Sequence, residues 1–183
     1  MMISWFSSFT RTAGIRVPVP AHPFLLLAWL CLLVSPAQGG GIRPDATLEI
    51  QDTEQHRIAS LLVEIADTPA ARERGLMDRI LPDDQTGMLF IFPETAPRTF
   101  WMRNTPASLD MLFADSEGRI IHIAPETRPF SDQHYPSQGP ARYVLETRGG
   151  FAARHGVVPG MRITYFAAPL GRPQDPGEPK STP

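Results

Sequence analysis

The sequence predicts a mainly β protein, a small antiparallel β-sandwich or barrel-like domain with two short helices. Three observations predict it. Residues 57–66 alternate side chains between two faces, as a half-buried strand does. Eight short apolar or alternating runs follow one another at close spacing, which is typical of sandwiches and barrels. Most of the gaps between the runs hold Pro or Gly, residues that turn the chain.

The expected strands come in chain order, and the turns between them are short. They are residues 47–51, 57–66, 87–92, 99–102, 109–114, 119–124, 143–147 and 161–166. Residues 115–118 (Asp-Ser-Glu-Gly) are typical of a hairpin turn and would join 109–114 to 119–124. We therefore expect neighbouring strands to pair in antiparallel fashion.

Two short helices are expected within this series of strands. Thr68 can cap a helix that begins at Pro69 and stops at Gly75. Residues 151–155 predict one or two further turns, ended by Gly156. Neither helix is long enough for the repeated crossovers of a doubly wound fold.

The N-terminus resembles a cleavable signal peptide, residues 1–37. Arg11 and Arg16 precede an unbroken apolar run at 24–34, which is shorter than the roughly 20 residues that span a bilayer. Small residues at Ser35 and Ala37 suit cleavage after Ala37. Cleavage would remove Cys31, the only cysteine, and leave a mature chain without thiol chemistry. The alternative is a segment retained as a membrane anchor.

This leader predicts an exported protein, periplasmic or secreted, that meets the membrane only through its signal peptide. Residues 38–46 are expected to form a flexible lead-in, 47–168 a single β-rich domain, and 169–183 a Pro-rich disordered tail. The predicted mature chain is long enough to bury a core without a disulfide.

Composition and motifs disfavour several functional classes. The chain has 17 Lys and Arg against 19 Asp and Glu, with no basic run, so we expect no nucleic-acid partner. It carries no nucleophile elbow and no phosphate-binding glycine loop. We therefore expect no cofactor.

A metal site is also not expected. The histidines of the predicted mature chain, namely His56, His122, His134 and His155, lack metal-ligand spacing. The methionines could suggest copper in an exported protein, but they lie in apolar runs where methionine usually fills a core.

Several segments in order resemble the domain of unknown function 192 family of bacterial and archaeal proteins. They are residues 63–69 (VEIADTP), 74–77 (RGLM), 87–90 (GMLF), 100–105 (FWMRNT) with 109–110 (LD), 141–146 (ARYVLE) and 156–160. The resemblance spans about 61–166 and implies a compact, mainly β domain, often behind a signal peptide. It implies no activity. Arg103 stands where many members have lysine.

The residues with most chemical potential are five: Arg74, Trp101, Asn104, Asp110 and Glu146. Asp110 faces the same way as Leu112 and so needs a partner, either structural or functional. Asn104 can simply turn the chain, and Arg74 can simply suit a helix C-terminus. The sharper hypothesis gathers all five at one end of the domain as a small polar pocket, with Trp101 as an apolar wall.

Two functions remain open. The first is a non-enzymatic binding or accessory domain that takes a small polar ligand, such as a sugar, near Trp101, Asp110 and Glu146. The alternative is a small exported hydrolase with Asp110 and Glu146 as an acid/base pair. Residues 130–140, which carry Asp132, His134 and Tyr135, are expected to form a loop without regular structure, either a binding loop or an ordinary one.

Overall fold

The computed structural model describes residues 42–167. The predicted signal peptide, residues 38–41 of the lead-in and the Pro-rich tail lie outside the described residues. Seven strands and two short helices follow in chain order: β1 (Ala46–Gln51), β2 (Arg57–Ala66), α1 (Pro69–Arg74), β3 (Thr86–Phe100), β4 (Leu109–Ala114), β5 (Ile120–Ala124), β6 (Tyr135–Arg148), α2 (Phe151–His155) and β7 (Arg162–Ala167). No helix among these residues is long and apolar enough to cross a membrane.

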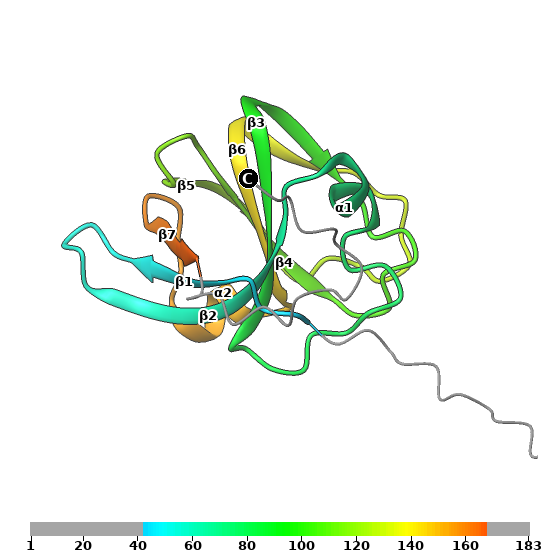
Figure 1. The fold of residues 1–183 in the computed structure, drawn as a ribbon, viewed down its shortest axis with the longest axis horizontal. Coiled ribbons are helices and arrows are strands. Elements are labelled where there is room, and N and C mark those ends of the chain that lie inside the picture. Colours follow the sequence, from blue (N-terminus) through cyan, green and yellow to red (C-terminus); the bar gives the residue numbers. More distant parts are fainter. Residues whose placement is uncertain (1–41, 168–183) are drawn as a thin grey trace, which may run out of the picture. The chain divides into compact units, whose positions relative to one another are not determined.

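The strands form one curled, mixed sheet in the order β5-β4-β6-β3-β2-β1-β7. The curl brings β7 round to the start of β5, where Arg119 bridges Arg162 and Ile163 N donates to Gly118 O at 2.8 Å (Figure 1). The mainly β fold with two short helices is confirmed. The antiparallel sandwich is wrong, because a single sheet closes halfway into a barrel.

One parallel pair within residues 42–167 departs from the predicted topology. β2 and β3 run parallel, with Leu62 opposite Thr86 and Ala66 opposite Phe90. A parallel pair needs a long crossover, and residues 67–85, which include α1, provide it. Thr68 caps α1 as predicted, with its Oγ1 accepting from Ala71 N at 3.1 Å.

Two predicted strands and one predicted loop merge into longer strands. Residues 87–92 and 99–102 join as β3, which passes an irregularity between Ile91 and Ala96. Of the loop expected at 130–140, only residues 130–134 lie outside a strand, because β6 begins at Tyr135, which pairs with Phe100. Prolines at 136 and 140 conceal the strand, since their missing N–H groups argue against a ladder.

The sheet has two apolar faces, and each carries its own core. Inside the curl lie residues such as Leu48, Val63, Leu112, Leu145 and Phe151. On the opposite face of β3, β6 and β4, α1 and the rest of the crossover cover a second cluster that includes Leu76, Met88, Phe90, Met111 and Phe113. Figure 1 shows α1 on the side of these central strands away from β1, β2 and β7. The crossover therefore forms a roof over one face of the sheet.

Candidate functional site

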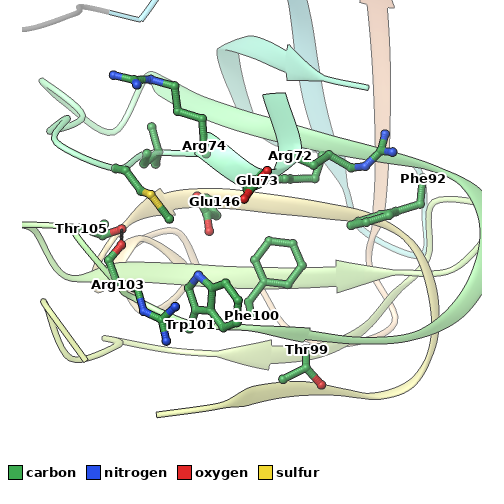
Figure 2. Close-up of a pocket in the computed structure, with 14 residues that line it drawn as sticks. Arg72, Glu73, Arg74, Phe92, Thr99, Phe100, Trp101, Arg103, Thr105 and Glu146 are labelled. Atoms are coloured by element: carbon green, nitrogen blue, oxygen red, sulfur yellow. Dashed lines mark hydrogen bonds between the residues drawn. The ribbon is translucent and has the colours of Figure 1, made fainter. Parts of the chain in front are cut away.

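A pocket of about 230 Å³ lies between this roof and the sheet. The part of the roof that lines the pocket is residues 72–77, from the end of α1 onward. Phe90, Phe92, Phe100 and Glu146 line it from β3 and β6, and four residues complete its side: Thr99, Trp101, Arg103 and Thr105. Figure 2 shows Glu146 beneath α1, with Phe100 and Trp101 beside it.

Phenylalanine rings shape the apolar part of the pocket. Phe100 meets Phe90 edge to face at 5.0 Å between centroids, and it meets Phe113 in the same way at 5.8 Å. Edge-to-face packing holds rings in defined orientations. Gly75 permits the roof to approach this closely, because a Cβ there would lie 3.2 Å from the Phe90 ring and its φ is +47°. The apolar walls are thus preformed.

Glu146 is the buried acid of the pocket. It stands on β6 between Met88 of β3 and Met111 of β4, and it is only 4% exposed. Its carboxyl makes no hydrogen bond with any part of residues 42–167. Burial among apolar side chains raises the pKa of Glu146 to about 8, against a smaller opposing attraction from Arg79. The side chain is therefore mostly an uncharged carboxylic acid at neutral pH.

Arg79 lies behind Glu146 and is largely committed to other partners. Its Nη1 donates to Glu64 Oε2 at 2.9 Å, and its Nη2 donates to Gly75 O at 2.8 Å. The ion pair with Glu64 places a competing carboxylate at the guanidinium, whose Nε has no partner within residues 42–167. This arrangement ties the roof to β2, and the charge of Arg79 only partly offsets the effect of burial on the pKa of Glu146.

Trp101 forms the exposed aromatic side of the pocket. Its side chain is 42% exposed, and the Arg103 guanidinium stacks on the indole at 4.7 Å. Arg103 is in turn held by Asp132, with Nε donating to Oδ1 at 2.7 Å. The stack holds the indole in place, so Trp101 forms a fixed side of the pocket.

Three of the five residues singled out from the sequence surround this pocket: Arg74, Trp101 and Glu146. Asn104 lies next to it as a turn residue, with φ 55° and its carbonyl accepting from Asp78 N at 2.8 Å. That bond joins the loop after β3 to the roof. The sequence did not single out the phenylalanines or Arg79, since both look like ordinary core or surface residues in the chain.

Asp110 does not line the pocket, and the structure does not bring it together with Arg74, Trp101 and Glu146. It accepts three backbone bonds, from Glu126 N at 2.7 Å, Gly150 N at 2.8 Å and Ala152 N at 2.8 Å. Two of these donors belong to the first turn of α2, whose own N-cap residue, Gly150, has no side chain to offer. Asp110 therefore caps α2 from a neighbouring strand.

The sheet register also separates Asp110 from Glu146. Asp110 pairs with Thr147 and Met111 pairs with Glu146, so the two carboxylates occupy successive positions across the same ladder. Side chains at successive positions point to opposite faces of a sheet. Asp110 faces the core inside the curl, whereas Glu146 faces the roof. The structure therefore does not bring Asp110 and Glu146 together as the predicted acid/base pair requires.

Residues 130–140 contribute support rather than pocket lining. Asp132 holds Arg103, and the Tyr135 hydroxyl accepts from Arg128 N at 2.9 Å. His134 is exposed and makes no side-chain hydrogen bond to the rest of residues 42–167. No group of three or more potential metal-binding side chains occurs within that described span.

The fold and the site together define a small curled-sheet domain with a roofed, aromatic pocket around a buried acid. The chain belongs to the family of domain of unknown function 192, "Uncharacterized ACR", whose model matches residues 49–165. The resemblance seen in the sequence is confirmed. No curated protein matches the chain.

Two solved structures share the fold and much of the sequence. A protein of Sinorhizobium meliloti 1021, described as a candidate transcription regulator, is 38% identical with a TM-score of 0.64, over 68% of this chain and 95% of its own. A protein of unknown function from Novosphingobium aromaticivorans DSM 12444 is 36% identical with a TM-score of 0.61, over 70% of this chain and 89% of its own.

Proposed function

We propose that this protein is an exported, non-enzymatic binding domain that holds a small molecule in the pocket beneath the crossover. Export is supported by the sequence of residues 1–37, which has the charge, apolar run and small residues of a signal peptide. Binding is supported by the pocket itself, since concave apolar sites with a few placed polar groups are where small ligands bind.

One observation carries the proposal: the Glu146 carboxyl is buried, faces the pocket, and has no hydrogen-bond partner within residues 42–167. The fully buried side-chain atoms without a partner in this span are Arg79 Nε, Arg142 Nε and Thr147 Oγ1, so the Glu146 carboxyl is open to the pocket rather than sealed off. Because no group of residues 42–167 bonds to it, the carboxyl is available to a ligand, and a hydrogen bond to it would contribute about 1 kcal/mol.

A fragment screen tests the proposal directly. Isotope-labelled full-length protein would be titrated with a library of single-ring fragments, and backbone and indole shifts would be followed by NMR. We expect hits whose shifts centre on Phe100, Trp101 and Glu146. Fragments recovered unchanged after long incubation would support binding without turnover.

Two matched variants assign the hits to the pocket. Trp101→Ala removes an exposed aromatic side chain that lines the pocket, whereas Phe130→Ala removes one that is 69% exposed and does not line it. Hits should be lost in the first variant and kept in the second. A screen without hits, or hits that survive Trp101→Ala, would overturn the proposal.

A further inference from the structure

The polar groups around the pocket that remain free to bond a ligand are mostly donors. Trp101 offers an indole N–H, which can only donate. No partner for this N–H occurs in the described part of the chain, and Figure 2 shows the indole nitrogen turned inward, toward Glu146. Thr105, by contrast, already donates its hydroxyl to Arg103 O at 3.3 Å.

Glu146 adds a second donor at the base of the pocket. Because burial raises the pKa of its carboxyl to about 8, the group carries a proton at neutral pH. A carboxylic acid donates through its O–H, and an O–H bond to an anionic oxygen is among the strongest hydrogen bonds in proteins. The pocket therefore presents an O–H and an N–H to the same enclosed space.

Two arginines lie around Phe92, and of these Arg72 lines the pocket whereas Arg98 does not. The Arg72 Nη1 donates to the backbone carbonyls of Asp67 and Ile91, and its guanidinium stacks on Phe92 at 5.2 Å. Arg98 stacks on the same ring at 4.0 Å. Neither arginine forms a salt bridge with a carboxylate among residues 42–167, so two cations are held around one ring.

Arg74 adds a third cation at the rim. It too forms no salt bridge within the described span, and in Figure 2 its guanidinium extends away from Glu146. Its contribution is charge near the mouth rather than a fixed contact. Glu73 is the opposing carboxylate on α1, and the charge of Arg103 is met by Asp132. Arg72 and Arg74 together outweigh Glu73.

The pocket is large enough for one ring with a substituent. A cavity of about 150 Å³ lined by apolar side chains holds benzene, and this pocket measures about 230 Å³. Phe90, Phe92 and Phe100 suit a flat apolar body, which stacks well against aromatic rings.

We propose that the ligand is a small aromatic carboxylate, with its ring among the phenylalanines and its anionic group at Glu146 O–H and Trp101 N–H. This inference rests on the proposed binding function and names the chemical class of its ligand. The arginines at the mouth attract the anion and exclude cationic analogues.

Three probes with one ring and different charges test the ligand class: benzoate, benzamide and benzylamine. Calorimetric titration of the full-length protein at pH 6.5 should show benzoate binding about ten-fold tighter than benzamide. Benzylamine should not bind measurably. Glucose serves as a neutral, hydroxyl-rich probe and is expected to bind more weakly than benzoate.

The outcomes separate this inference from the binding function. If benzamide or glucose binds at the pocket and benzoate binds no better, the ligand class is wrong and the binding function stands. If neither the four probes nor the fragment library binds, both proposals fail.

Charge variants supply an independent measurement. Arg74→Gln removes a rim cation that has no salt bridge in the described residues, and Arg128→Gln removes an exposed arginine that does not line the pocket. We expect Arg74→Gln to weaken benzoate binding about three-fold at low salt and to leave benzamide unchanged. Equal effects of the two variants on benzoate would contradict an anion site at this mouth.

Discussion

Two buried carboxylates on neighbouring strands have opposite environments in this protein. Asp110 is fully buried but accepts three backbone N–H bonds, two of them from the first turn of α2. Glu146 is almost as buried, lies among methionines and phenylalanines, and has no hydrogen bond within residues 42–167. Burial alone therefore does not distinguish a structural acid from a binding one. Their hydrogen-bond partners distinguish them, because a carboxylate that already accepts bonds from its own fold has little capacity left for a ligand.

The largest expected effect concerns the pH dependence of stability. The folded state keeps the Glu146 proton up to about pH 8, whereas the unfolded chain releases it near pH 4.5. Between these values the folded state binds more protons, so the free energy of unfolding falls as pH rises. The pKa difference corresponds to a loss on the order of 5 kcal/mol relative to Glu146→Gln.

Denaturant unfolding of the full-length protein and of Glu146→Gln, measured from pH 4 to pH 9, checks this prediction. The glutamine variant should gain stability over the parent protein as pH rises, with the gain levelling off above pH 8. A constant difference between the two proteins across this range would contradict a buried, protonated Glu146.

Replacing the Asp110 carboxylate should lower the stability of the protein, whereas replacing that of Glu146 should raise it. Asp110→Asn keeps the shape but replaces one accepting oxygen with an N–H₂ group, so either the Ala152 bond to Oδ2 or the Glu126 and Gly150 bonds to Oδ1 are lost. We expect a loss of about 3 kcal/mol in the free energy of unfolding near neutral pH. Benzoate affinity at a temperature where the variant is folded should not change.

Thermal and chemical denaturation measure the free energy of unfolding, and calorimetry measures the benzoate affinity. Lower benzoate affinity with unchanged stability would show that Asp110 takes part in binding. The two acids would then not differ in role.

The next effect concerns the pH dependence of binding. The charged groups around the pocket are Arg72, Glu73 and Arg74 from the roof and Arg103 from the loop after β3, and Arg79 with its partner Glu64 also lies near Glu146. Loss of the Glu146 proton removes a donor and adds a negative charge beside the anion, so it should weaken benzoate binding about thirty-fold by pH 9.5.

The control is Glu146→Gln, which keeps a donor at the base of the pocket but cannot ionise. Its benzoate affinity should stay flat over the same pH range. An equally steep decline of benzoate affinity in the variant would show that a group other than Glu146 makes binding depend on pH.

A smaller effect on binding is expected at Trp101. Trp101→Phe retains an aromatic wall and removes only the indole N–H, so benzoate affinity should fall about five-fold, the equivalent of roughly 1 kcal/mol. Benzamide affinity should fall less, because its carbonyl oxygen is a weaker acceptor than a carboxylate. Calorimetry on both probes measures the difference, and an unchanged benzoate affinity would exclude the indole as a donor.

Much of the fold could be predicted from local patterns. The alternation in residues 57–66, the cap at Thr68 and the turn at 115–118 all act over a few residues, and each is found in the structure. The parallel pairing of β2 with β3 could not be predicted, because nothing in either strand records its direction relative to the other. That direction depends on how the crossover packs across the sheet.

The candidate site was only partly predictable for a related reason. Glu146 and Asp110 both interrupt apolar strands, and that interruption correctly marked them as unusual. Deciding between them required the ladder register, which places Met111 rather than Asp110 opposite Glu146. One position along β4 therefore separates a helix cap from a pocket acid.

The parallel crossover has a consequence for how this domain can diversify. The pocket's roof is a connection between two strands, whereas most of the barrel core lies on the other face of the sheet. Segment 67–85 could thus be replaced as a unit, provided that Leu76 and Leu81, which pack in the second core, are kept. Chimeras that carry a foreign roof on this sheet would change what the pocket accepts without rebuilding the barrel beneath it.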